Sequence, residues 1–147
     1  MSRSRFAADD GFTLTELLVA ILIIGILMAA GFAAFLHQRT KAEDAEAKVY
    51  AAAAAKAMTV YGQDHGDYRG ATQADLAKIE KSLAGARGLT IDADDGSFTV
   101  TVASTSGNDG GGSFTVERSD TGAVRRTCEH AGQGACADTP DAGGNSW

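Results

Sequence analysis

The sequence predicts an α+β fold, in which a long amino-terminal helix packs against a small antiparallel sheet. Three observations lead to this prediction. An apolar run extends from Leu17 to Leu36, residues with helical spacing continue to Tyr61, and apolar and polar residues alternate in short segments after Leu89. The first half of the helix is expected to span a membrane, and the second half to join a folded head.

The apolar run is long enough to cross a bilayer as a helix. Its 20 residues contain no ionisable side chain, and a helix of this length rises about 30 Å, the thickness of the hydrocarbon core. Glu16 stands immediately before the run. Because a carboxylate costs roughly 2.5–3.5 kcal/mol at the membrane centre and less near an end, Glu16 is a candidate functional residue.

Helical signals continue beyond the apolar run. One helical face carries Tyr50, Ala53, Ala54, Ala57, Met58 and Tyr61. The pattern predicts one helix from about Thr13 to Tyr61, ending near Gly62. Tyr50, Met58 and Tyr61 are expected to pack a head, whereas Glu43, Asp44 and Glu46 are expected to face solvent. Asp44 and Lys48 have the spacing of a favourable helical ion pair.

A loop and a short helix are expected next. Glycines and acids in residues 63–70 predict the loop, where His65 is interpreted as a surface residue rather than a catalyst. Thr72 is a suitable cap for a helix from Gln73 to Leu83.

Four short strands are expected in the remainder of the head. Their predicted cores are Leu89–Asp92, Phe98–Val102, Phe114–Val116 and Ala123–Arg125. Asp95-Gly96 predicts a hairpin between the first two strands, and the order predicts an antiparallel meander that covers the helix. The expected organisation is residues 1–11 as a leader, 12–62 as the long helix with 12–36 membrane-spanning, and 63–147 as the head.

The two cysteines, Cys128 and Cys136, lie near the carboxyl end. In an exported domain they favour one disulfide, which would close a short loop. The alternative is a metal site that includes His130, but three ligands fall short of a closed zinc site. Residues 138–146 are expected to be loose, and Trp147 packs either against the head or at a subunit interface.

The stretch Gly11-Phe12-Thr13-Leu14-Thr15-Glu16, followed by the apolar run, resembles the processing site of type IV prepilins and pseudopilins. The resemblance implies the type IV pilin fold and cleavage between Gly11 and Phe12 by prepilin peptidase, on the cytoplasmic side. It also implies methylation of the new Phe12 amine. Many pilins carry a proline midway along this helix, but the corresponding residue here is Ala33. An ordinary signal anchor does not explain the register of Gly11, Phe12 and Glu16.

The resemblance also implies how the chain assembles. Phe12 and Glu16 are the expected assembly residues, because the Phe12 amine released by cleavage can meet Glu16 of its own chain or of a neighbouring subunit. Expected partners are other pilins in a homo-oligomeric filament, the peptidase, the pilus assembly platform and, before assembly, the membrane. The chain would cross the bacterial cytoplasmic membrane once, with its carboxyl domain outside, and then enter an extracellular pilus.

Other functions are weighed against this one. The alternatives are a type II secretion pseudopilin, a minor pilin acting in adhesion or DNA uptake, and a signal-anchored enzyme. The net charge of −6 does not favour nucleic acid as a partner, and no catalytic arrangement, metal site or cofactor motif is recognised. Asp92, Asp94 and Asp95 faintly resemble a calcium loop, but the bidentate glutamate of an EF-hand is missing.

Overall fold

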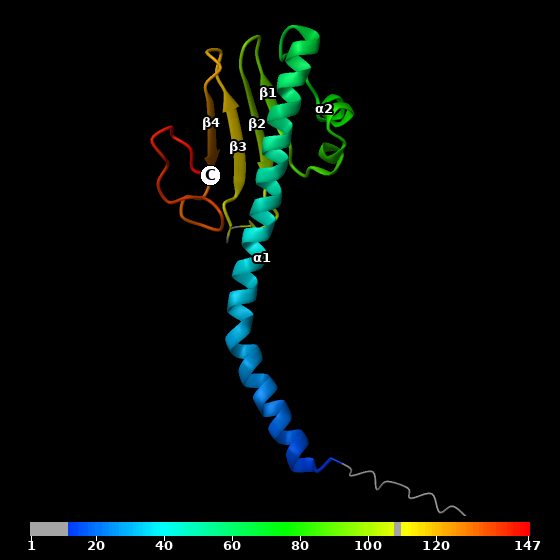
Figure 1. Ribbon diagram of the computed structural model, residues 1–147, viewed down its shortest axis with the longest axis vertical. Coiled ribbons are helices and arrows are strands. Elements are labelled where there is room, and N and C mark those ends of the chain that lie inside the picture. Colours follow the sequence, from blue (N-terminus) through cyan, green and yellow to red (C-terminus); the bar gives the residue numbers. More distant parts are fainter. Residues whose placement is uncertain (1–11, 108–109) are drawn as a thin grey trace, which may run out of the picture. The chain divides into compact units, whose positions relative to one another are not determined.

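The structure, a computed structural model, describes residues 12–107 and 110–147. It contains the helices α1 (Leu14–His65) and α2 (Gln73–Ile79), the 3₁₀ helix η1 (Lys81–Gly85), and the strands β1 (Thr90–Ala93), β2 (Phe98–Ala103), β3 (Ser113–Arg118) and β4 (Val124–Cys128) (Figure 1). The chain divides between Leu36 and His37 into two compact units, and α1 contributes to both. The proposed leader, residues 1–11, lies outside the described residues.

The four strands form one antiparallel sheet in the order β1-β2-β3-β4. Val100 of β2 pairs with Val116 of β3, and Val116 pairs in turn with Arg126 of β4. Each strand is joined to its neighbour in the sequence by a short connection, as the alternation and turn residues predict. The predicted α+β fold with an antiparallel meander is therefore confirmed.

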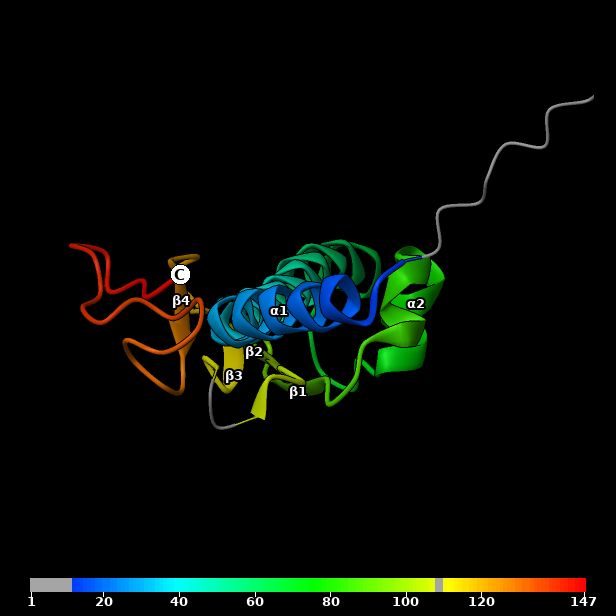
Figure 2. The ribbon, with the colours of Figure 1, turned by 90° about the horizontal axis from the view of Figure 1, so that it is seen from below.

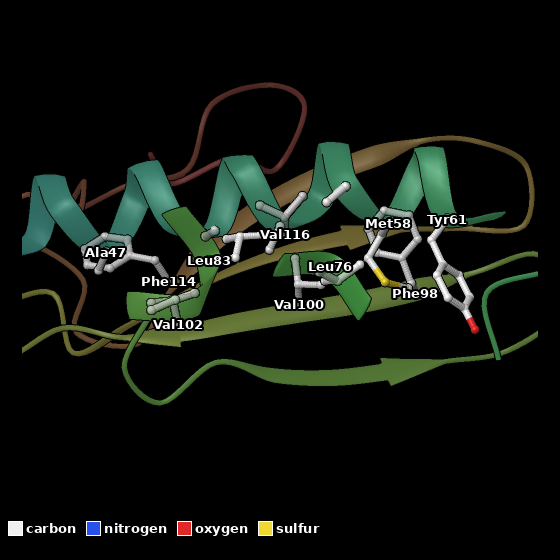
Figure 3. Close-up of a cluster of buried hydrophobic side chains, with 14 residues drawn as sticks. Ala47, Met58, Tyr61, Leu76, Leu83, Phe98, Val100, Val102, Phe114 and Val116 are labelled. Carbon is white, nitrogen blue, oxygen red and sulfur yellow. The ribbon is translucent and has the colours of Figure 1, made fainter. Parts of the chain in front are cut away.

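The core of the second unit lies between the sheet and α1. Within this unit, α2 lies on the β1 side of α1, whereas β4 and the carboxyl-terminal segment lie on the other side (Figures 1 and 2). Alternate residues of β2 and β3 meet α1 (Figure 3). The buried core includes Ala47, Ala51, Ala54, Met58 and Tyr61 of α1, Leu76 and Leu83, and Phe98, Val100, Val102, Phe114 and Val116 of the sheet. Small alanines let α1 approach the sheet closely, which leaves the branched and aromatic strand residues to fill the space.

Helix α1 ends three residues later than the sequence predicts. Gly62 lies inside the helix and does not end it; its missing side chain makes room for Tyr68, since a Cβ at this position would lie 2.6 Å from Tyr68 Cδ1. The His65 ring stacks on Tyr61 at a centroid distance of 4.0 Å and holds the last turn. The positive φ of Gly66 (87°) then ends the helix in the left-handed region that favours glycine.

The predicted helix over residues 73–83 is divided in two. Thr72 caps α2 as expected, and Asp75 completes a capping box. The helix ends at Ile79 because Glu80 adopts an extended conformation and its side chain accepts a hydrogen bond from Ser82 N, which begins η1. Leu83 is therefore buried from a 3₁₀ helix rather than from α2.

The carboxyl-terminal segment is attached to the sheet, and the expectation of a loose end is wrong. Ser146 N donates to Arg126 O at 2.8 Å, and Cys128 N donates to Ser146 Oγ at 3.1 Å. Trp147 donates from Nε1 to Thr127 O at 2.8 Å and meets the edge of Phe114. These contacts place Trp147 against the head and cover the outer edge of β4, which would otherwise offer unpaired backbone groups.

Candidate assembly site

The first unit of α1 presents apolar side chains on all sides. Leu17, Ile21 and Met28 are 61%, 60% and 70% exposed. One open strip of this surface is formed by Leu18, Ile21, Leu22, Gly25, Ile26 and Ala29. By length and composition, α1 is apolar enough to cross a membrane, with a mean hydropathy of 2.8 in its most apolar window. Such a surface needs an apolar environment, which only lipid or neighbouring chains supply.

Glu16 lies at the start of α1, where its carboxylate bonds the chain just before the helix. Oε2 accepts hydrogen bonds from Thr13 N at 3.0 Å and from Thr13 Oγ1 at 2.9 Å. Glu16 N donates in return to Thr13 Oγ1 at 3.2 Å. This reciprocal pattern is a capping box. Its sequence signature, Thr13-x-x-Glu16, could have predicted it, but the sequence-based prediction did not include it.

The capping box positions Glu16, and among the residues that the structure describes no cation pairs with its carboxylate. The partners that the structure gives its carboxylate come from Thr13. Phe12 is 87% exposed and lies four residues before Glu16. In the uncleaved chain its nitrogen belongs to a peptide bond, so a cation at Phe12 requires cleavage after Gly11. Gly11 itself lies outside the described residues.

Comparison with known proteins identifies the motif. A family model described as the prokaryotic N-terminal methylation motif matches residues 7–32, which include Gly11, Phe12 and Glu16. The chain thus carries the amino-terminal motif of prokaryotic prepilins and resembles the type IV pilins. It is 29% identical over 100 residues to a fimbrial protein of Neisseria meningitidis serogroup B, an alignment that covers 68% of this chain and 59% of the relative.

A second relative supports the same assignment. The pilin-like chain is 31% identical over 101 residues to the type IV major pilin protein PilE1 of Neisseria gonorrhoeae, an alignment that covers 68% of this chain and 61% of the relative. The matches thus span about three fifths of the length of these curated relatives. The family model identifies the amino-terminal motif, and the long helix with its antiparallel sheet is consistent with the type IV pilin fold, whereas the details of processing and assembly belong to the proposal below.

The second unit of the pilin-like chain holds an acid that the sequence analysis misplaced. Asp44 is fully buried, not exposed to solvent. Its Oδ1 accepts hydrogen bonds from Ser104 Oγ and Ser106 Oγ, both at 2.6 Å. Its Oδ2 accepts from Gly111 N and Ala135 N, both at 2.8 Å. One carboxylate therefore joins α1 to the segment between β2 and β3 and to the loop between the cysteines.

The pKa of Asp44 follows from these contacts. Burial raises the pKa, but the hydrogen bonds from Ser104, Ser106, Gly111 and Ala135 outweigh burial and hold the pKa below its usual value of 3.8. Gly134 has a φ of 55°, and a Cβ there would collide with Asp44 Oδ2. The close approach of this loop to the carboxylate therefore depends on glycine.

Lys48 does not form the helical ion pair predicted with Asp44. Its ammonium group donates to Ala135 O at 2.5 Å and lies 5.3 Å from the centre of the Phe114 ring. Burial lowers the pKa of Lys48, and the nearby Asp44 carboxylate opposes this shift. Asp44 and Lys48 thus hold neighbouring backbone groups of one loop, which is a long-range arrangement that helical spacing alone cannot reveal.

The remaining candidate residues have structural contacts. Cys128 and Cys136 form a disulfide with a Cα–Cα distance of 5.8 Å, and His130 Nδ1 lies 3.0 Å from Gly110 O. Asp95 forms an ion pair with Arg69 at 2.7 Å. Among the described residues, no group of three or more histidine, cysteine, aspartate or glutamate side chains is arranged to hold a metal ion.

Proposed function

We propose that this chain is a structural subunit of a type IV pilus filament, cleaved between Gly11 and Phe12 and methylated on the Phe12 amine. The observation that carries the proposal is the register of the methylation motif, with Glu16 four residues after Phe12 and directly before the apolar run. The similarity to a fimbrial protein and to a type IV major pilin supports a structural role in a pilus over a pseudopilin or an enzyme.

The exposed apolar side chains of the first unit support a subunit that lies first in the membrane and later in the filament. In the membrane, Leu17 to Leu36 would lie among lipid tails, with the amino terminus inside the cell and the head outside. In the filament, the same side chains would contact neighbouring helices. Gly25 and Ala29 are four residues apart, and an added Cβ at Gly25 would meet nothing within 4 Å. Small residues at this spacing allow helices to approach closely.

The pairing of Glu16 supplies the direction of assembly. In the membrane, the hydrogen bonds from Thr13 satisfy part of the carboxylate but do not neutralise it. Cleavage creates an ammonium group at Phe12, and an incoming subunit can present this cation to Glu16 of the subunit before it. In an apolar environment an unpaired charge is costly, so a subunit out of register is disfavoured. The required partners are prepilin peptidase, an assembly platform and other pilins.

Mass spectrometry of the native protein tests the proposal. The expected chain begins at Phe12 with one methyl group on its nitrogen, and it is present in long fibres sheared from the cell surface. Retention of Met1 to Gly11 in assembled fibres would contradict the processing step. Confinement of the mature chain to short periplasmic assemblies would instead indicate a pseudopilin, and a low copy number in the fibres a minor pilin.

A further inference from the structure

A surface groove beside α1 has a charge opposite to that of the chain as a whole. It lies on the β4 side of the helix, where the sheet extends beyond the helices that cover it (Figure 2). Its lining includes the cations Lys56, Arg118 and Arg126, and the apolar residues Phe98, Val116 and Val124. No carboxylate is part of this lining, although the chain has a net charge of −6.

Two cations of this basic groove are held by aromatic residues, and none of the three has an acid partner among the described residues. Arg118 donates from Nη1 to the Tyr68 hydroxyl at 2.6 Å, and the Arg126 guanidinium lies 5.8 Å from the centre of the Trp147 ring. Among the described residues, none of Lys56, Arg118 and Arg126 forms an ion pair. Arg125, the neighbour of Arg126, points to the other face of the sheet and pairs with Glu117 at 2.7 Å.

Acids without ion pairs lie at the opposite edge of the sheet. Asp92 of β1 and Asp94 of the following turn are both exposed, and neither forms an ion pair within the described residues. Ile91 and Ala93 alternate with them and are partly buried. We call residues 91–94 the acidic edge. Since β1 and β4 are the two edges of the sheet, Asp92 and Arg126 lie at opposite edges, whereas Asp94 and Arg118 line a common open hollow.

We propose that the basic groove of one copy binds the acidic edge of the next copy in the filament. This inference rests on the proposed function, because it names a contact between the heads of assembled subunits. Heads with a net negative charge repel one another, and a contact between Asp92 and Asp94 and the free cations offsets that repulsion. A contact between two different surfaces repeats from copy to copy and generates an open helical filament when its rotation does not close a ring.

Carbodiimide cross-linking of wild-type fibres tests the contact without a mutation. The reagent joins the Lys56 amine to a carboxylate as an amide, and the carbodiimide takes up the water lost and becomes a urea. We expect a Lys56–Asp92 or Lys56–Asp94 cross-linked peptide in fibres and its absence from detergent-dissolved monomers. A link from Lys56 only to other acids or to another protein would overturn the proposal, as would the same link at equal yield in monomers.

Charge reversal supplies a second test with a matched control. Arg126→Glu should lower the yield of fibres at least about ten-fold, because like charges then face one another across the contact. Arg125→Glu makes the same change one residue away on the opposite face and should leave most of the yield. Adding Asp92→Lys to Arg126→Glu should restore fibres if the two residues face one another. Equal yields from Arg126→Glu and Arg125→Glu would overturn the proposal.

The subunit role and the contact between heads can be tested separately. If wild-type cells make surface fibres that lack this chain, the proposed function fails and the contact between heads has no setting. If wild-type fibres contain the chain but neither the cross-link nor the charge reversal behaves as expected, the subunit role stands and the head contact alone is wrong. Far-ultraviolet circular dichroism of each variant, purified from membranes, verifies that its head has folded, because Trp147 fluorescence would respond directly to a change at Arg126.

Discussion

The two units of α1 differ in what covers their apolar side chains. In the unit that begins at His37, the helix buries Ala51, Ala54 and Met58 against a sheet of the same chain. In the unit before it, Leu17, Ile21 and Met28 remain exposed, and no other element within residues 12–107 and 110–147 covers them. One helix therefore has a self-sufficient half and a half that must be covered by lipid or by other chains.

Each half also holds one carboxylate that is costly in an apolar environment, and the two are satisfied differently. Asp44 receives four hydrogen bonds from residues 60 to 91 positions away in the sequence. Glu16 receives hydrogen bonds from Thr13, three positions away. Fixed donors within the chain satisfy Asp44. The proposed assembly role of Glu16 instead requires its charge to be available to a second molecule, which local and neutral partners such as Thr13 allow.

The largest effect is expected from removing the charge of Glu16 while keeping its capping role. Glu16→Gln retains an oxygen acceptor for Thr13, and glutamine is accepted in a capping box. We expect the chain to insert into the membrane normally and fibre yield to fall at least about ten-fold, because the Phe12 amine loses its acid. Immunoblots of sheared fibres and of membranes measure the two quantities.

A control separates the charge of Glu16 from its role as a cap. Thr13→Ala removes the cap side chain, which costs about 1 kcal/mol, and leaves the carboxylate in place. It should therefore retain most of the fibre yield. If Thr13→Ala and Glu16→Gln were equally defective, the capping box would explain the phenotype and the pairing would not.

The next largest effect concerns Asp44. Asp44→Asn replaces one acceptor oxygen with a donor group that faces buried donors, and we expect a loss of about 3 kcal/mol in the free energy of unfolding. Urea unfolding of the full chain in detergent, followed through the single tryptophan Trp147, measures this change. Glu43→Ala is the control, because Glu43 makes only a partly exposed helical pair with Arg39 and should change stability by less than about 0.5 kcal/mol. Equal effects would mean that Asp44 is not the acid that holds the loops.

The pH dependence of the free energy of unfolding is a further test of the role of Asp44. Because the pKa of Asp44 in the folded head lies below 3.8, the unfolded chain binds more protons as the solution is acidified. The stabilisation is therefore present above about pH 3.8 and is lost as the pH falls further, through the pKa of the folded state. Asp75, whose pKa is lowered to about 2 by hydrogen bonds from Lys78 and Thr72, contributes in the same acidic range. The Asp44→Asn variant should show a shallower acid dependence than the wild type, and identical profiles would contradict the assignment.

The smallest effect is expected from removing the N-cap of α2, which involves neither Glu16 nor Asp44. Thr72→Ala removes the capping box of α2 and should lower the free energy of unfolding by about 1 kcal/mol. Fibre yield should not change, since α2 belongs to the self-sufficient unit. A large loss of fibres from this variant would show that local stability of the head, and not the Glu16 charge, limits assembly.

The features that sequence predicts here are those encoded over short distances. The span of the apolar run, the alternation in β2 and β3 and the Thr72 cap each depend on residues within one element. The burial of Asp44 could not be predicted, because its partners Ser104, Gly111 and Ala135 meet it only after the sheet has formed. The division of the second helix at Glu80 was missed because the apolar spacing of Leu76, Ile79 and Leu83 continues through an extended residue. The attachment of Trp147 is likewise a product of tertiary structure.

The central claim concerns the carboxylate of Glu16 in the assembled fibre. A cryo-electron microscopy map at side-chain resolution would locate it relative to the Phe12 nitrogen of the neighbouring subunit. We predict a separation of about 3 Å, the distance of a charge-assisted hydrogen bond. A Glu16 carboxylate that remains bound to Thr13 of its own chain, or faces water, with no cation near it, would contradict the account.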